Sequence, residues 1–169
     1  MAGLTPPRPL AAADDRLSFD CGRESLNRWF RRHAWQNQET GASRTTVVCD
    51  VETGLVAGFV SLSAAQIERE RLPRAAQRNQ PDPVPAILIG QLAVATRLQG
   101  KGYARSLLQH ALRTAVRMSR EVGCVVVLLH PLDDDLRRFY ARFGFETLEA
   151  DPQRSMAVRI KDLERAGFS

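Results

Sequence analysis

The chain has 169 residues with 24 basic and 19 acidic side chains, which gives a formal net charge of +5. This length suits one domain over residues 1–169 that can bury a full hydrophobic core, with residues 1–12 as an extended tail. No segment reaches the roughly 18 consecutive apolar residues of a membrane-spanning helix, and the start of the chain lacks the apolar centre of a signal peptide. These features exclude an integral membrane protein and predict a cytoplasmic one.

The three cysteines of the sequence argue against a metal centre. Cys21, Cys49 and Cys124 form no C-x-x-C pair and no cluster with histidine of the kind that binds zinc. Cys49 and Cys124 fall at the ends of predicted strands, where we expect buried thiols, and unpaired cysteines are usual in the cytoplasm. We therefore predict no metal site.

The basic residues are almost all arginines. Of the 24 basic side chains only two, Lys101 and Lys161, are lysines, so the other 22 are arginines. A guanidinium group keeps its charge and pairs with phosphate through two parallel hydrogen bonds, which makes the chain a candidate for binding RNA or another polyanion. A GC-rich genome would produce the same excess of arginine. Only the positions of the arginines can therefore indicate whether they bind RNA.

The first predicted element is a helix over residues 24–38 with two different faces. Leu26, Phe30 and Ala34 recur at helical spacing and form an apolar face. The opposite face is basic and carries an indole, which is typical of an RNA-binding surface because arginine pairs with phosphate while an indole stacks on a base. A purely solvated face is the alternative. The residues concerned are Arg28, Arg31, Arg32 and Trp35.

Two strands are predicted next, over residues 45–50 and 55–63, with a hairpin turn at residues 52–54. A basic segment over residues 66–85 follows, which is either a second RNA contact or a solvated, mobile loop. The candidate RNA contacts in this part of the chain are Arg44, Arg74 and Arg78.

The most informative segment joins a predicted strand over residues 86–95 to a predicted helix over residues 102–122. Gly100 and Gly102 allow a tight turn and a close approach of the backbone to a ligand. The N–H groups at the start of the helix, together with its dipole, then favour an anion such as a phosphate. The spacing R-x-x-G-x-G matches neither the Rossmann nor the P-loop fingerprint. An ordinary helix cap is the alternative.

The remaining elements are a strand over residues 125–130, a helix over 133–143 that Gly144 closes, and strands near 145 and over 155–160. This order predicts an α/β fold with a mixed sheet and helices on both faces. Tyr140 lies on the apolar side of the helix over 133–143, where it either packs or serves chemistry.

The segments RLQGKGYARSLL, from Arg97, and DDDLRRFYARFGFE, from Asp133, resemble the GCN5-related N-acetyltransferases, the GNAT family. With FDCGRESLNRWFRRHAWQNQ at the front, the resemblance covers nearly the whole chain and narrows to the GNAT toxins of bacterial toxin-antitoxin pairs. It implies the GNAT fold, a central twisted mixed sheet flanked by helices, and acetyl-coenzyme A (acetyl-CoA) as cofactor. The residues that it implies for cofactor binding are Leu92, Ala93, Val94, Arg97, Gln99, Gly100, Lys101, Gly102, Tyr103, Ala104 and Phe139.

The resemblance also implies a reaction. Such toxins transfer acetyl to the α-amino group of an aminoacyl-tRNA, which stops translation. The Val94 N–H is expected to polarise the thioester carbonyl, and Tyr140 to protonate the departing thiolate as general acid. Much of an α-amino group is already unprotonated near neutral pH, so a strong base is not required. We therefore expect His33, His110 and His130 to be surface or packing residues.

The resemblance further implies a ribbon-helix-helix antitoxin as partner and a homodimer. Two alternatives stay open: a GNAT enzyme that acetylates a small amine or a protein N-terminus, and a non-catalytic RNA-binding module on the same fold. Steep loss of substrate binding with rising salt would separate a tRNA substrate from a small neutral amine. Ser43, Ser61 and Ser63 are candidates for the acceptor pocket, whose amino-acid specificity does not follow from the motifs.

Overall fold

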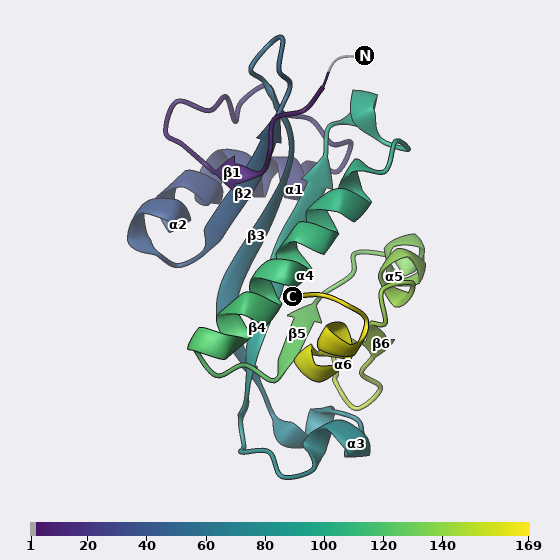
Figure 1. Ribbon diagram of the computed structural model, residues 1–169. Helices are drawn as coiled ribbons and strands as arrows, with labels where there is room; N and C mark the ends of the chain where they lie inside the picture. The colour runs from purple at the N-terminus through teal and green to yellow at the C-terminus, as the bar shows by residue number, and fades with distance from the viewer. Residues whose placement is uncertain (1–2) are drawn as a thin grey trace. The chain divides into compact units, whose positions relative to one another are not determined.

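A computed structural model of the chain describes residues 3–169 (Figure 1). Within these residues the strands follow the order β1-β2-β3-β4-β5-β7-β6. β4 and β5 are parallel, whereas β1 with β2, β2 with β3, β5 with β7 and β6 with β7 are antiparallel. The predicted α/β class with a mixed sheet is confirmed. The strands are β1 Arg8–Pro9, β2 Arg44–Cys49, β3 Val56–Ile67, β4 Val84–Val94, β5 Val126–Leu129, β6 Glu146–Thr147 and β7 Met156–Arg159.

The helices match the predicted positions with two additions, α3 in the basic segment and α6 at the end of the chain. They are α1 Glu24–Trp29, a π-helical turn Phe30–Ala34, α2 Trp35–Thr40, α3 Arg74–Gln77, α4 Tyr103–Glu121, α5 Asp134–Ala141 and α6 Ile160–Arg165. Between residues 3 and 169, none of the helices combines the length and the apolar character needed to cross a membrane.

The described chain divides into two compact units. The first holds residues 3–63 and 90–111, and the second holds residues 64–89 and 112–169. β3, β4 and α4 each contribute residues to both units. The single domain expected over residues 1–169 stays a prediction, and residues 1 and 2 of its expected tail lie outside the described residues.

Helices cover both faces of β3 in the first unit. The Phe59 ring stacks on Phe30 of the π-helical turn, with centroids 4.2 Å apart. Its neighbour Gly58 points the other way, and a Cβ built there would lie 2.9 Å from Leu107 of α4. Because successive residues of a strand point to opposite faces, the α1 side and the α4 side are packed independently. The predicted helices on both faces are therefore present in this unit.

The first helix is not regular, which changes the environment of Trp35. The π-helical turn Phe30–Ala34 lies between α1 and α2. A π turn holds more residues than an α turn, so regular 3.6-residue spacing no longer predicts which face a later residue occupies. Trp35, which the sequence placed on the basic face, is partly buried and packs against the apolar core of this unit. The Arg16 guanidinium covers its ring at 5.9 Å.

The expected tail is extended but is held in place. Arg8–Pro9 pairs with Thr46–Val47 of β2, and Leu10 is buried. Arg8 forms a two-pronged ion pair with Asp14, with N–O distances of 2.7 and 2.9 Å. From residue 3 onward this segment is therefore part of the folded structure, because β2 offers it an unpaired edge.

The second unit has its own apolar core, and the basic segment 66–85 belongs to it. Leu72 and Ala76 of that segment are buried against residues of β5 and β7. β3 runs on to Ile67, four residues beyond the predicted end at Ser63. The segment is thus an anchored connection with short helices, since its apolar side chains find a core while its arginines stay outside.

Candidate active site

The glycine turn after β4 forms an open cradle at the start of α4. Gly100 and Gly102 have φ angles of 78° and 87°, in the left-handed region that favours glycine. A Cβ built on either would meet nothing within 4 Å, so the space beside the backbone is free. The first N–H groups of α4 have no intrahelical partner, and the helix dipole adds positive potential there. This arrangement fits the pyrophosphate of a coenzyme.

The side chain of Gln99 holds the glycine turn in place. Its side-chain amide donates hydrogen bonds to the carbonyl oxygens of Cys21, at 2.8 Å, and Val94, at 2.9 Å. Thr96 adds two bonds to the carbonyl of Asp20, one from its backbone N–H at 2.9 Å and one from its hydroxyl at 3.0 Å. Gln99 is among the residues predicted to bind the cofactor, and this stays a prediction, while its side-chain amide is engaged by the protein.

Asn27 holds the segment to which the turn is tied. It is 4% exposed, its Oδ1 accepts the backbone N–H of Cys21 at 2.9 Å, and its Nδ2 donates to Asp20 Oδ1 at 2.9 Å. Asp20 Oδ1 also accepts the N–H of Gly22. Sequence reasoning missed Asn27 as a functional support. A polar residue beside Leu26 on an otherwise apolar face was the signal.

The amide of Val94 points away from β3. The next amide along the chain, that of Ala95, donates to Ala57 of β3 at 2.8 Å. Consecutive amides of an extended strand point to opposite sides, so the Val94 N–H points to the other side of β4. The parallel pairing with β5 joins Ala86–Ile89 to Val126–Leu129, whereas β4 runs on to Val94. β4 therefore continues beyond its pairing with β5.

Tyr140 lies on α5 among aromatic rings. It is 7% exposed, and the rings of Phe139 and Phe145 meet it edge-on with centroids 5.2 and 5.9 Å away. Asp133 caps the helix by accepting the Leu136 N–H, and Gly144 ends it with a φ of 91°. Such packing restricts the rotamer of Tyr140. A restricted rotamer is what a general acid needs to donate its proton to one fixed atom.

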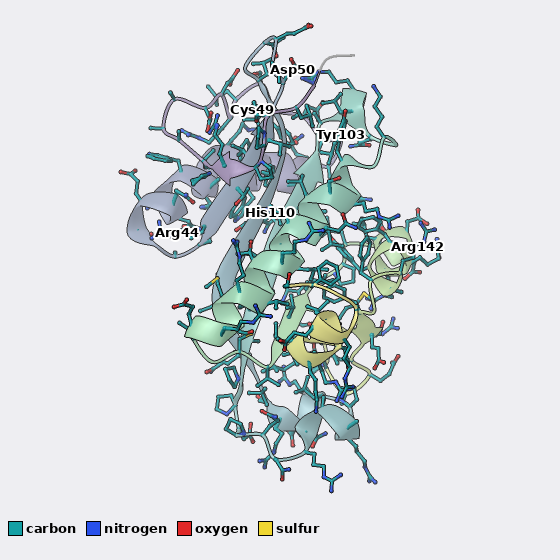
Figure 2. All side chains as sticks on the ribbon, in the orientation of Figure 1. Arg44, Cys49, Asp50, Tyr103, His110 and Arg142 are labelled. Atoms are coloured by element: carbon teal, nitrogen blue, oxygen red, sulfur yellow. The ribbon has the colours of Figure 1, made fainter. Side chains whose placement is uncertain are left out.

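The other predicted cofactor residues differ in their surroundings. Arg97 is half-exposed, and its guanidinium lies 3.9 Å from the Asp50 carboxylate. It also lines a cavity of about 250 Å³ with Asp15 and Asp20. Lys101 is exposed at the turn. Figure 2 shows Tyr103 at the first turn of α4, where it is partly buried like Ala104, and β4 residue Leu92 is partly buried too.

The candidate RNA contacts are mostly free of strong internal pairing. Arg28, Arg32, Arg74 and Arg78 are exposed. Arg31 forms an ion pair with Glu24 at 2.6 Å, and Arg44 donates to the carbonyl of Gln38 at 2.8 Å. The structure places Arg28, Arg31, Arg32 and Arg44 in the first unit and Arg74 and Arg78 in the second.

Two hydroxyl groups at the start of β2 are buried without a partner. Ser43 Oγ and Thr45 Oγ1 have no hydrogen bond within the described part of the chain. Thr45 pairs across the strands with Ser61, which is also buried. Buried hydroxyls of this kind are costly unless something binds them, so Ser43 and Ser61 stay candidates for the acceptor pocket. Ser63 is partly buried.

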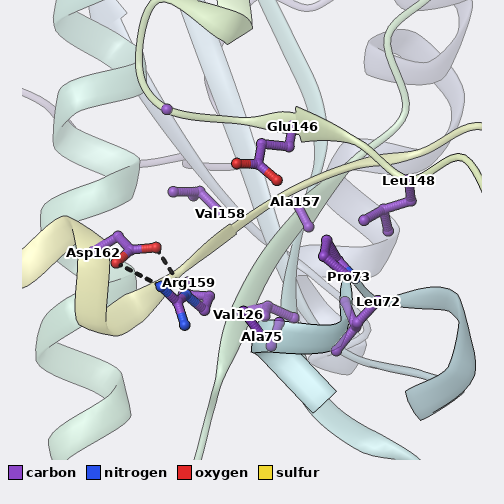
Figure 3. Close-up of a pocket in the computed structure, with 12 residues that line it drawn as sticks. Leu72, Pro73, Ala75, Val126, Glu146, Leu148, Ala157, Val158, Arg159 and Asp162 are labelled. Atoms are coloured by element: carbon purple, nitrogen blue, oxygen red, sulfur yellow. Dashed lines mark hydrogen bonds and ion pairs between the residues drawn. The ribbon is translucent and has the colours of Figure 1, made fainter. Parts of the chain in front are cut away.

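The second unit also contains a small cavity of about 100 Å³, to which the sequence analysis gave no function (Figure 3). Its walls combine apolar side chains with the charged groups of Glu146, Arg159 and Asp162, and Arg159 is already paired with Asp162 at 2.8 Å. That hydrogen-bonded pair raises the pKa of the Arg159 guanidinium. Across residues 3–169, no three or more histidine, cysteine, aspartate and glutamate side chains gather in a way that could hold a metal ion.

The comparisons with known proteins agree on one family. Residues 42–147 match the acetyltransferase (GNAT) domain. A tRNA-acetylating toxin of Mycobacterium tuberculosis is 38% identical over 162 residues, which cover 96% of each chain. The structure of AtaT complexed with acetyl-methionyl-tRNAfMet is 27% identical, with a TM-score of 0.89 over 97% of this chain and 99% of that one. The structure of AtaTR bound with acetyl-CoA is 25% identical, with a TM-score of 0.82 over 96% and 97%.

Proposed function

The chain belongs to the GNAT acetyltransferases, and we propose that it transfers the acetyl group of acetyl-CoA to the α-amino group of an aminoacyl-tRNA. One observation carries the chemistry. The open cradle at Gly100 and Gly102 follows directly on a strand whose last amide, that of Val94, points away from its β3 neighbour. Anion binding at Gly100 and Gly102 and carbonyl activation at Val94 are thereby only six and eight residues apart on one continuous backbone.

The cradle and β4 would hold the coenzyme. The backbone around Gly100 to Ala104 binds the pyrophosphate, with Lys101 supplying a further charge and Tyr103 a wall. The pantetheine arm of the coenzyme lies along Leu92, Ala93 and Val94 of β4. Phe139 of α5 adds a further contact to the coenzyme. Acetyl-CoA supplies the acetyl group as a thioester. The Val94 N–H stabilises the negative charge that develops on the thioester oxygen when the amine attacks.

Tyr140 is the general acid of the proposal. Its phenol donates a proton to the sulfur as the carbon–sulfur bond breaks, so the coenzyme leaves as a thiol. The acetylated amine has lost its charge and its nucleophilicity, so the aminoacyl-tRNA no longer accepts a peptide. Arrest of translation follows from that loss.

Exposed arginines supply the affinity for tRNA. Arg28, Arg32, Arg74 and Arg78 present guanidinium groups to solvent, where they can pair with phosphate. Such binding releases counterions, so it weakens steeply as salt rises. Trp35 contributes through its exposed edge, since Arg16 and the core take up part of its surface.

The proposal includes two protein partners. A toxin that halts translation in its own cell needs a neutralising partner, and we assign this role to a ribbon-helix-helix antitoxin. The toxin itself is expected to form a homodimer in the cytoplasm. Co-purification with the product of the adjacent gene, and light scattering of the isolated toxin, test these two points separately.

The test of the proposed function uses purified protein, labelled acetyl-CoA and total charged tRNA. Mass spectrometry of the released aminoacyl-adenosine ends would identify each acetylated amino acid. Acetylated ends support the proposal and name the substrate. Binding of acetyl-CoA without any labelled tRNA would overturn it and favour a small amine or a protein N-terminus as acceptor.

A further inference from the structure

A buried amide side chain on α1 holds the segment 20–22, which lies between this helix and the coenzyme turn. Asn27 is 4% exposed, although its side chain is fully polar. Its Oδ1 accepts the backbone N–H of Cys21, and its Nδ2 donates to Asp20 Oδ1, both at 2.9 Å. A single side chain of α1 thus fixes the segment through two hydrogen bonds.

The same segment holds the coenzyme turn on its other side. The carbonyl oxygen of Asp20 accepts the backbone N–H of Thr96 at 2.9 Å and the Thr96 hydroxyl at 3.0 Å. The carbonyl oxygen of Cys21 accepts the side-chain amide of Gln99 at 2.8 Å. Thr96 and Gln99 stand just before Gly100, where the cradle begins. The position of the turn therefore depends on the side chain that holds this segment.

The two partners of Asn27 specify an amide at this position. The N–H of Cys21 can only donate, so the amide oxygen faces it and the NH₂ group faces Asp20. Hydrogen bonds from Gly22 and Asn27 hold the pKa of Asp20 below its usual value, so this carboxyl group is ionised at neutral pH. An aspartate in place of Asn27 could accept the first bond but could not donate the second.

We propose that Asn27 is a positioning residue for the coenzyme, which acts through the segment 20–22 on the backbone that binds the pyrophosphate. Backbone N–H groups bind an anion well only when they converge on it, so a small shift of the turn weakens binding. The inference rests on the proposed function for the place of the coenzyme. It adds the residue on a separate helix that keeps this place ready.

The same helix region carries candidate RNA contacts, which provide an internal comparison. Arg28 directly follows Asn27, and Arg32 lies in the π-helical turn, and both are exposed. Their guanidinium groups can meet phosphate from solvent without any contribution from the coenzyme turn. A change at Asn27 should therefore weaken the binding of acetyl-CoA and leave the binding of tRNA as it is. A merely structural role would weaken both.

The test measures two dissociation constants by calorimetric titration, one for acetyl-CoA and an apparent one for total tRNA. It compares the unaltered protein with Asn27→Asp, with the exchange Asp20→Asn plus Asn27→Asp, and with the control Val47→Ala. Val47 is 0% exposed in β2, so V47A lowers stability by leaving a cavity in the core. Denaturant titration first shows that each protein is folded.

The prediction for N27D depends on pH. At pH 8 it loses a donor and places two carboxylates side by side, so the dissociation constant of acetyl-CoA should rise about 30-fold. At pH 5.5 the two carboxyl groups share a proton, which restores a donor, and the rise relative to the unaltered protein should shrink to about 5-fold. The charged groups near the pair are Arg31, Asp15 and Arg97, and every variant retains them.

The exchange variant and the control should behave differently from N27D. The exchange again combines one carboxylate with one amide, so acetyl-CoA should bind within about 3-fold of the unaltered protein at both pH values. V47A should bind acetyl-CoA as the unaltered protein does. The apparent dissociation constant of tRNA should stay the same in all four proteins.

Thr96→Val tests the same support from the side of the turn. It removes the hydroxyl that donates to the Asp20 carbonyl at an exposed position, so the fold is not at risk. The dissociation constant of acetyl-CoA should rise about 5-fold, as expected for one lost hydrogen bond. If N27D does not fold, the exchange variant and T96V decide the inference.

Unchanged binding of acetyl-CoA in N27D at pH 8, or in T96V, would overturn the inference. An equal loss in V47A would also overturn it, because lost stability would then account for the weaker binding. The same holds for an equal loss of tRNA binding in N27D. If the unaltered protein binds acetyl-CoA but acetylates no charged tRNA, the proposed function fails, and the dissociation constants of acetyl-CoA still decide the role of Asn27.

Discussion

Gln99 donates a hydrogen bond of 2.8 Å from its side-chain amide to the carbonyl oxygen of Cys21, which ties the coenzyme cradle to the segment before α1. Its second bond, to the carbonyl of Val94, fixes the end of β4. One side chain therefore sets the geometry of the cradle and of the strand that carries the activating amide.

Gln99→Glu is expected to loosen this geometry. A carboxylate cannot donate to the two carbonyl oxygens, so two hydrogen bonds are lost and their acceptors are left unpaired. The free energy of unfolding should fall by about 2 kcal/mol. The KM for acetyl-CoA should rise, as steady-state kinetics would show. Gln36→Glu makes the same chemical change at an exposed position and should alter neither quantity. Equal stability and KM in Q99E would contradict the supporting role.

Tyr140→Phe removes only a hydroxyl group. If the phenol protonates the leaving thiolate, kcat should fall about 100-fold or more while the dissociation constant of acetyl-CoA stays the same. Release of free thiol measures the rate, and calorimetric titration measures binding. Growth arrest in expressing cells should disappear with an intact fold. A well-expressed Y140F protein that remains fully toxic would remove Tyr140 from the mechanism.

The double variant Arg28→Ala, Arg32→Ala tests the RNA surface on the first helix. Each lost phosphate contact should reduce the slope of log KM for tRNA against log salt by about 0.7 to 0.9. The matched control is Arg117→Ala with Arg165→Ala, which removes the same charge from two other exposed positions. If both pairs change the slope equally, net charge alone accounts for tRNA affinity and the helix has no special part.

The ion pair between Arg8 and Asp14 makes stability depend on pH. The hydrogen bonds from Arg8 outweigh burial and hold the pKa of Asp14 below its usual value. A carboxyl group whose folded pKa is depressed stabilises the fold above its unfolded pKa and loses this effect as pH falls through the folded pKa. Asp14→Asn should therefore cost on the order of 1 kcal/mol at pH 7.

That difference between D14N and the unaltered protein should shrink below about pH 4 and close at lower pH. Urea unfolding at pH 7 and at pH 3 measures it. A difference that is the same at both pH values would mean that the carboxylate charge of Asp14 does not contribute.

Gly58→Ala tests the close contact between β3 and α4. Its new Cβ would lie 2.9 Å from Leu107 and 3.0 Å from the carbonyl oxygen of Ala93, and the second of these is backbone that cannot move aside freely. Overpacking of this kind should destabilise the fold by about 2 kcal/mol. Gly123→Ala, where a Cβ meets nothing within 4 Å, is the control. Denaturant titration with equal midpoints for both would contradict the tight contact.

Much of the fold could be predicted because its signals are local. The apolar run of β4, the glycine turn and the regular stripe of α4 stand next to one another in the sequence, and the structure confirms each within a few residues. The acidic residues at the start of α5 and the glycine after its end likewise predicted the bounds of that helix from neighbouring residues. The resemblance to the family added what residues alone could not supply, namely the coenzyme and the reaction.

What escaped prediction depends on tertiary contacts. Trp35 changes its surroundings because a π turn precedes it, and no pattern of hydrophobicity announces such a turn. His130 is exposed, as expected of a surface histidine, but its contact with Ser155 could not be predicted, because the two residues are 25 apart and meet only after β7 pairs with β5. The hydrogen bond of Gln99 to the carbonyl of Cys21 also escaped prediction, because Cys21 lies 78 residues earlier in the chain.

β1 has a consequence for how a partner protein can engage the sheet. It is the outermost strand next to β2, and Pro9 and the nearby Pro6 and Pro7 have no N–H group to donate. An incoming peptide strand would find an edge with several donors missing, so the sheet is closed to extension by β-augmentation there. A partner protein that adds a strand at this edge must therefore first peel away residues 3–10, which would uncover Leu10 and break the Arg8–Asp14 pair.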